Sequence, residues 1–145
     1  MSDCIDPYDW PEGADFDVLV VDDEPVVRDA VARMLASEAL RAVCVDRGER
    51  ALTHRALDAC RLLVCDLMMP GMSGLDLIRA VRARRPGLPV LAITGYATPE
   101  VAAQVAESGA TEFLAKPFDP EELLVKVRHI LARAAPDDAG KEVGS

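Results

Sequence analysis

Short apolar runs and longer amphipathic stretches alternate along this chain of 145 residues. The short runs, bounded by turn residues, are typical of strands buried on both faces of a parallel sheet. The longer stretches repeat apolar residues every three or four positions, which predicts helices with one buried face. We predict strands over Phe16–Val21, Arg41–Val45, Leu62–Cys65, Pro89–Ile93 and Glu112–Ala115. We predict helices over Pro25–Glu38, Gly48–Ala59, Gly74–Arg84, Pro99–Ser108 and Pro120–Arg133.

Five consecutive strand–helix units predict an α/β fold, a doubly wound parallel sheet with right-handed crossovers. The second strand is the most polar, so we place it at an edge of the sheet. The length suits one domain with a full core, over residues 16–133. Residues 1–15 and 134–145 show little periodicity, and we interpret them as an acidic N-terminal tail and a C-terminal tail.

Charge and composition exclude several classes of protein. The net charge is −9, most of it in the two tails, and no basic patch indicates direct nucleic-acid binding. No apolar run approaches the roughly 18 residues of a membrane span, and the acidic N-terminus is unlike a secretory signal. The four cysteines lack CxxC spacing and a nearby His, so we expect thiols without a metal or disulfide role. We therefore expect a cytoplasmic protein without membrane insertion.

Acidic residues follow two of the predicted strands. Asp22 and Asp23 come directly after the first strand, and Asp66 comes after the third. Ligands of open α/β sheets gather at the carboxyl ends of strands, so these carboxylates should meet at one edge. Carboxylates brought together repel unless a cation intervenes, and Mg²⁺ suits a set of oxygen ligands. A single Asp at a strand end is more often a turn former or helix cap; the three together favour a magnesium site.

A lysine and a threonine end two further strands. Lys116 lies in an apolar setting in a chain that uses Arg far more often, and its ammonium suits a phosphoryl oxygen. The alternative is a surface lysine whose stem packs on Phe118. We also predict that the Lys116–Pro117 peptide bond is cis. Thr94 offers a hydroxyl to the same edge, although Thr before Gly is also common in turns.

The polar positions lie within four motifs that together resemble a known family. They read Val-Asp-Asp-Glu-Pro at 21–25, Cys-Asp-Leu-Met-Met-Pro-Gly-Met-Ser-Gly-Leu-Asp at 65–76, Ile-Thr-Gly at 93–95 and Lys-Pro-Phe at 116–118. Their order and the elements between them resemble the receiver domain of response regulators in two-component signal transduction. The resemblance implies a flavodoxin-like (βα)5 sheet with strand order 2-1-3-4-5.

The resemblance also implies a role for each of these residues. Asp66 is then the phosphoacceptor, which attacks the phosphohistidine of a kinase and becomes an aspartyl phosphate. Asp23, Asp66 and the backbone carbonyl of Met68 are then the direct Mg²⁺ ligands, with Asp22 bound through water. Lys116 and the metal offset the charge of the phosphoryl group.

A switch follows from the same resemblance. Thr94 would bond the new phosphoryl group, and Phe113 would turn inward into the space that Thr94 leaves. A partner would recognise the change at the surface formed by the fourth helix, fifth strand and fifth helix. Met68 and Tyr96 should flank the path of a hydrolytic water and slow dephosphorylation, unless they merely line the rim of the site.

We therefore expect a single-domain receiver, not a conventional enzyme, that phosphorylates and dephosphorylates itself. Its partners would be a sensor histidine kinase or histidine phosphotransferase, a downstream protein and, on phosphorylation, a second copy of the chain. Three alternatives are a receiver cut from a longer regulator, a Mg²⁺-dependent phosphatase with an aspartyl phosphate, and a binding scaffold that is not phosphorylated. The phosphatase is disfavoured because the acids after the first strand are adjacent, and because no insertion supplies a substrate pocket.

Overall fold

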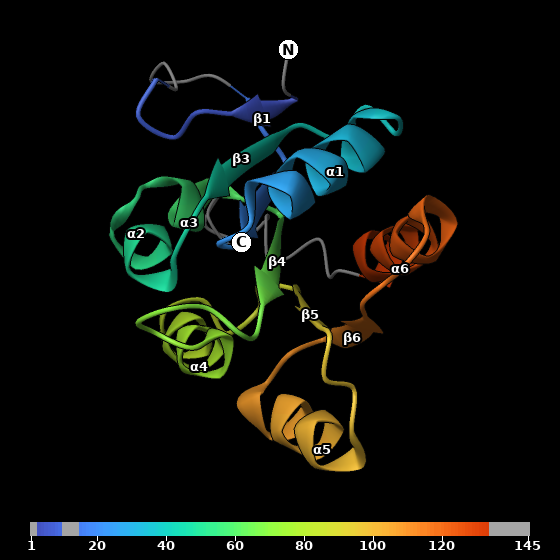
Figure 1. The fold of residues 1–145 in the computed structure, drawn as a ribbon. Helices are drawn as coiled ribbons and strands as arrows, with labels where there is room; N and C mark the ends of the chain where they lie inside the picture. The colour runs from blue at the N-terminus through green and yellow to red at the C-terminus, as the bar shows by residue number, and fades with distance from the viewer. Residues whose placement is uncertain (1–2, 10–14, 134–145) are drawn as a thin grey trace.

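The computed structural model describes residues 3–9 and 15–133, which form a six-stranded parallel sheet with helices on both faces (Figure 1). The strand order is β1-β3-β2-β4-β5-β6. The strands are β1 (Cys4–Ile5), β2 (Val18–Val21), β3 (Ala42–Val45), β4 (Leu62–Asp66), β5 (Val90–Thr94) and β6 (Glu112–Ala115). The helices are α1 (Pro25–Ala36), α2 (Gly48–Thr53), α3 (Ala56–Ala59), α4 (Gly74–Arg84), α5 (Pro99–Ser108) and α6 (Pro120–Arg133).

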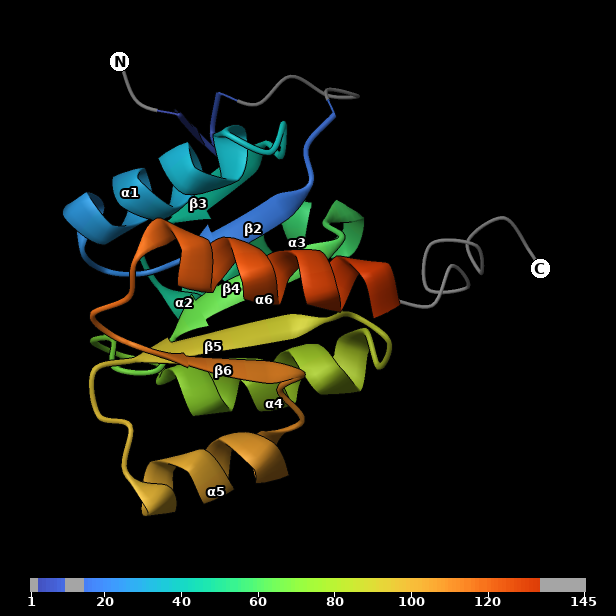
Figure 2. The ribbon, with the colours of Figure 1, turned by 90° about the vertical axis from the view of Figure 1, so that its right-hand side faces the viewer.

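The sheet separates two apolar cores. Alternate residues of a strand point to opposite faces, so Val18 and Val20 of β2 face one core while Leu19 and Val21 face the other. Helices α1 and α6 cover the first core, and α2 to α5 cover the second (Figure 2). Leu19 is fully buried, and burial of such a side chain contributes about 1.5–3 kcal/mol. The all-apolar strands are therefore the framework of the fold, as predicted.

Side-chain caps fix where three helices begin. The Ser73 hydroxyl accepts a hydrogen bond from Asp76 N at 3.2 Å at the start of α4. The Thr98 hydroxyl likewise accepts from Val101 N at 3.1 Å at the start of α5. Before α6, Asp119 accepts from the backbone N of Glu122 at 2.9 Å, and the Glu122 side chain accepts from Asp119 N at 3.0 Å. These caps satisfy orphan N–H groups, which confirms the predicted start positions.

The N-terminal segment corrects the expected five-stranded sheet. Strands β3-β2-β4-β5-β6 reproduce the order 2-1-3-4-5, but β1 adds a parallel strand outside β3, with Cys4 opposite Ala42 and Ile5 opposite Val43. Within the predicted tail, Cys4–Ile5 thus belong to the sheet, and β3 is buried along its length instead of lying at an edge. A strand of two residues between acids has no periodicity to reveal it, and its backbone pairs with groups that β3 would otherwise expose.

The second predicted helix, Gly48–Ala59, is also wrong as a single element. It divides into α2 and α3 because His54 adopts an extended backbone between them. The ring nitrogen Nδ1 of His54 accepts a hydrogen bond from Ala56 N at 3.0 Å, and Nε2 lies 2.6 Å from the carbonyl of Pro7. The break between α2 and α3 therefore places His54 where its ring contacts the N-terminal segment at Pro7.

The predicted C-terminal tail, 134–145, lies outside the described residues. Within residues 3–9 and 15–133, no helix has both the length and the apolar character needed to cross a bilayer.

Candidate functional site

The predicted polar residues meet at the carboxyl edge of the sheet. Val21 pairs with Cys65 in the register, so Asp22 leaves β2 beside the end of β4, where Asp66 lies. Thr94 ends β5 and pairs with Ala115, directly before Lys116. The chain reverses its direction of winding between β2 and β4, which is where ligands of such sheets bind. The register thus brings together side chains that are far apart in sequence.

Asp66 is a buried carboxylate at this edge, with 4 % of its surface exposed. Burial and then the charge of Asp22 raise its pKa to about 6, and the ammonium of Lys116, 3.6 Å from Oδ2, partly offsets the rise. The backbone N–H of Met68 donates to Oδ1 at 3.4 Å. An acid whose charge is this poorly compensated is poised to take a cation or an electrophile.

Asp22 is held in place by its own neighbours. Its Oδ1 accepts from Glu24 N at 2.9 Å, and its backbone carbonyl accepts from Arg28 Nη1 at 2.6 Å. Burial raises the pKa of Asp22, against the lowering effect of the bond to Glu24 N and of Lys116. The α1 residue Arg28 therefore braces the end of β2 against the helix that follows it.

Lys116 is the cation of the site. Its Nζ lies 3.3 Å from Asp22 Oδ2, 3.6 Å from Asp66 Oδ2 and 3.5 Å from Glu24 Oε1. Burial alone would lower its pKa, but Asp22 and Asp66 raise it above its ordinary value, so the ammonium stays charged. Its backbone N donates to Thr94 O at 2.7 Å, and the Lys116–Pro117 bond is cis, as predicted. The alternative of a surface lysine does not fit this placement.

The acids form a group that could hold a divalent cation. One carboxylate oxygen from each of Asp22, Asp23, Glu24 and Asp66 lies within 4.8 Å of the others. An all-oxygen set with two buried members fits the preference of Mg²⁺. Glu24 was not among the predicted ligands, although it directly follows the acidic pair in the sequence and could have been found there. The residues present therefore fit the metal that we expected.

Thr94 and Phe113 lie on neighbouring strands. Thr94 is buried, and its hydroxyl accepts a hydrogen bond from Tyr96 N at 3.0 Å. Phe113 pairs in register with Ala92, and it packs, partly buried, against the core that Ala92 belongs to. Alternate residues of β5 share a face, so the Thr94 side chain lies on the same face as Ala92 and its neighbour Phe113. The two predicted switch residues therefore share one face of the sheet.

Met68 and Tyr96 are exposed at the rim. Met68, two residues after Asp66, exposes 59 % of its surface, and Tyr96, two residues after Thr94, exposes 63 %. They come from the loops after β4 and β5 respectively. Both side chains are therefore largely open to solvent, and their predicted role in water access stays a prediction.

The loop after β4 depends on Gly74, which the sequence places in a turn, and on Glu49, which sequence reasoning missed. Gly74 packs so closely on β4 that a Cβ there would overlap the backbone carbonyl of Asp66 and lie 2.6 Å from Leu67 Cα. Glu49 of α2 accepts a hydrogen bond from Met72 N at 3.1 Å. The glycine is visible in the sequence as part of a turn, but its close approach to the acid's backbone depends on tertiary packing.

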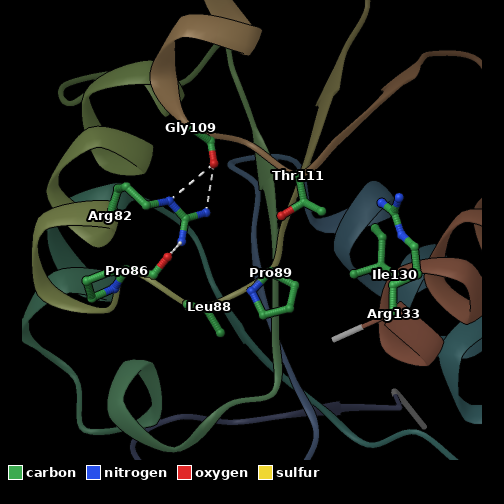
Figure 3. A pocket seen from close by; sticks show the side chains of 9 residues that line it. Arg82, Pro86, Leu88, Pro89, Gly109, Thr111, Ile130 and Arg133 are labelled. Carbon is green, nitrogen blue, oxygen red and sulfur yellow. Dashed lines mark hydrogen bonds between the residues drawn. The ribbon is translucent and has the colours of Figure 1, made fainter. Parts of the chain in front are cut away.

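A hollow of about 650 Å³ lies at the opposite, amino edge of the sheet (Figure 3). There Arg82 donates to the carbonyl of Gly109 at 3.2 and 2.8 Å, and to that of Pro86 at 2.7 Å. The guanidinium thus braces the loops that lead into β5 and β6. The second arginine of the lining, Arg133, lies 3.7 Å from Glu112. With both arginines engaged and no acidic cluster in its lining, this hollow lacks the chemistry of the carboxyl edge.

Several known proteins are similar to this chain in sequence and in fold. The "Response regulator MprA" of Mycobacterium leprae is 38% identical over 128 residues, which cover 87% of this chain and 55% of that protein. The chain therefore spans about half the length of the curated relatives it matches. Among solved structures, the chemotaxis protein CheY4 of Vibrio cholerae is 30% identical with a TM-score of 0.75, over 81% of this chain and 99% of that one. The receiver domain of NtrX from Brucella abortus is 33% identical with the same TM-score, over 81% and 99% of the two chains.

The family model described as "Response regulator receiver domain" matches residues 18–128, which contain every residue of the acidic cluster, Thr94 and Lys116. Residues 18–128 are more than half of the chain, and the CheY-like neighbours share the flavodoxin-like order of β3-β2-β4-β5-β6. The chain therefore belongs to the response regulator receiver domain family of two-component signalling.

Proposed function

We propose that this receiver accepts a phosphoryl group on Asp66 from the phosphohistidine of a sensor histidine kinase or a histidine phosphotransferase. The observation that carries the proposal is the placement of the buried Asp66 carboxylate 3.6 Å from the ammonium of Lys116. An oxygen of Asp66 would attack phosphorus, the bond from phosphorus to the histidine nitrogen would break, and the imidazole would leave. Lys116 would meet the charge of the transferring oxygens.

The acidic cluster would hold Mg²⁺ during this transfer. The proposed ligands are Asp23, Asp66 and the backbone carbonyl of Met68, with Asp22 bound through water. When bound, the metal supplies positive charge that stabilises the phosphoryl oxygens and the carboxylates. Asp22 already receives hydrogen bonds from Glu24 N and Arg28, so the chain itself holds this ligand's orientation.

The phosphoryl group would then change the surface through Thr94 and Phe113. The Thr94 hydroxyl accepts from Tyr96 N in this state, so its hydrogen is the donor that would reach a phosphoryl oxygen. Movement of Thr94 would leave space on the face that Phe113 shares, and Phe113 would turn inward. The face of α5, β6 and α6 would present the change to a downstream protein or to a second phosphorylated copy.

An apolar groove beside the site supports docking of the phosphoryl donor. It holds about 420 Å³ between α1 and the loop after β6, and its lining includes the exposed Val26, then Met34, Pro117 and Phe118. Lys116 also lines it, so a partner seated there would lie next to the cation of the site. Exposed apolar side chains in a groove favour a protein partner that buries them, such as the helix that carries a phosphohistidine.

The test is the mass of the intact protein after incubation with acetyl phosphate, with Mg²⁺ and with a chelator. We expect a gain of one phosphoryl mass that requires Mg²⁺ and disappears in the Asp66→Ala variant. The matched control is Asp76→Ala, because Asp76 is an exposed acid on the nearby helix α4 and its removal should leave the gain intact.

Two outcomes would refute the assignment. A gain that persists in folded Asp66→Ala would move the acceptor to another residue. Absence of any gain in the folded wild-type protein would favour the alternative of a binding scaffold that is not phosphorylated.

A further inference from the structure

Two cysteine side chains meet outside the acidic site. The sulfur of Cys44, on β3, lies 2.7 Å from the sulfur of Cys4, on β1, across a sequence separation of 40 residues. The other two cysteines contact backbone carbonyls instead: Cys60 that of Leu57 at 3.6 Å, and Cys65 that of Asp66 at 3.3 Å. All four are thiols in this structure, so Cys4 and Cys44 form its one thiol pair among the described residues, which include every cysteine.

The sheet register explains why the pair meets. Cys4 pairs with Ala42, and Cys44 follows Ala42 by two residues, so its side chain lies on the same face of β3. Ala42 and Cys44 belong to the core under α1 and α6, and Cys4 packs against that core from the sheet edge. The pairing of β1 with β3, which sequence reasoning missed, thus places the two sulfurs side by side.

We propose that Cys4 and Cys44 are a reversible dithiol–disulfide site, which a hydroperoxide oxidises and which then covalently fastens β1 to β3. Cys4 is the half-buried member at the sheet edge, and Cys44 is the buried one. Cys4 is therefore the sulfur that an oxidant in solvent reaches first.

The oxidation proceeds in two balanced steps. The Cys4 sulfur attacks one oxygen of the peroxide and the O–O bond breaks, so Cys4 becomes a sulfenic acid. The other oxygen leaves with the proton of the thiol, as water from hydrogen peroxide or as an alcohol from an organic hydroperoxide. The Cys44 sulfur then attacks the Cys4 sulfur, the S–S bond forms, and the sulfenic hydroxyl leaves as water with the Cys44 proton. The two thiols lose two electrons in total, and the peroxide gains them.

The surroundings assign different parts to the two sulfurs. The hydrogen bond to Cys4, and then burial, raise the pKa of the Cys44 thiol above its ordinary value, so Cys44 keeps its proton until the second step. Cys4 donates its own hydrogen to Asp29 Oδ1 at 3.5 Å, which leaves a lone pair of Cys4 facing Cys44. The pair is therefore arranged as an outer sulfur that is oxidised and an inner sulfur that resolves it.

The test starts from fully reduced protein, freed of reductant and treated with hydrogen peroxide. We expect intact monomers to lose two hydrogen atoms, non-reducing peptide mapping to join Cys4 to Cys44, and dithiothreitol to reverse both changes. Cys4→Ser should abolish the link, and this half-buried edge position makes it the safer variant for folding. Cys60→Ala is the matched control, since it removes a buried thiol outside the pair and should leave the link intact.

A second measurement reports the consequence for the fold. Oxidation should raise the thermal unfolding midpoint by up to about 10 °C, because the link closes a loop of some 40 residues in the unfolded chain. The rise should be absent in Cys4→Ser. Oxygen addition without a link, a disulfide between two chains, a link to Cys60 or Cys65, or folded protein that stays reduced would each overturn the proposal.

Discussion

Replacing Asp66 by Asn should stabilise the metal-free protein. Asp66 is nearly fully buried, and its pKa rises from 3.8 to about 6, so the fold disfavours the charged carboxylate. A shift of this size corresponds to about 3 kcal/mol above pH 6. Asn has the same shape, keeps an oxygen that can accept from Met68 N, and has no charge to bury. The free energy of unfolding should therefore increase by about that amount.

The pH dependence gives this prediction its sign. Because the folded pKa lies above the unfolded value, folding favours the protonated acid, and wild-type stability falls as pH rises from 3.8 through 6. Below the unfolded pKa, Asp66 is neutral in both the folded and the unfolded wild-type protein, so Asn no longer increases the free energy of unfolding. At about pH 5 the advantage should be roughly half of its value at about pH 7.5.

Urea denaturation of both proteins at these two pH values, in the presence of a chelator, measures the effect. Adding Mg²⁺ should stabilise the wild type more than the variant, because a bound cation offsets the repulsion between carboxylates. The difference between the two free energies of unfolding should therefore become smaller. Asp9→Asn, at an exposed acid, should change stability by less than about 0.5 kcal/mol. The reasoning would be refuted by a variant no more stable than the wild type near pH 7.5. It would also be refuted if the difference in the free energy of unfolding were not smaller at pH 5.

Three further predictions concern the edge of the site. Gly74→Ala should lose at least about 2 kcal/mol in urea denaturation because its Cβ would overlap β4, whereas Gly95→Ala, with open space around it, should stay within about 0.5 kcal/mol. Lys116→Met should slow acetyl phosphate-dependent mass gain at least about tenfold, since the cation 3.6 Å from the β4 carboxylate is lost; an unchanged time course contradicts this. Replacing both Met68 and Tyr96 by Ser should shorten the half-life of the phosphoryl group, measured as the loss of its mass from the intact protein over time. An unaltered half-life would mean that the two residues only line the rim.

The residues at the carboxyl edge were predictable because their positions follow from strand periodicity alone. A buried parallel strand is a continuous apolar run, so the first polar residue after it marks the edge of the sheet. Asp22, Asp66, Thr94 and Lys116 all follow such runs, and the structure brings them to one place. The caps of α5 and α6 were equally visible, because proline and capping side chains act locally.

What the sequence did not reveal depends on contacts between distant segments. β1 has two residues and exists because β3 offers an open edge, which no local pattern records. The break at His54 arises partly from its contact with Pro7, 47 positions away. Arg28 could not be recognised as a brace for Asp22, since an arginine on a helix is ordinarily a solvated residue. Tertiary partners, not propensity, determine each of these features.

The edge strand β1 also bears on how the domain can be cut or fused. The family match begins at Val18, and a fusion partner joined at that boundary would replace the segment that contains β1. The outer backbone groups of Ala42 and Val43, which β1 covers, would then face solvent along an apolar strand, where a neighbouring molecule can add a strand of its own. A unit for transfer into other proteins therefore starts no later than Cys4. Chimeras cut at the family boundary would expose an aggregation-prone edge at β3, which β1 pairs with in this chain.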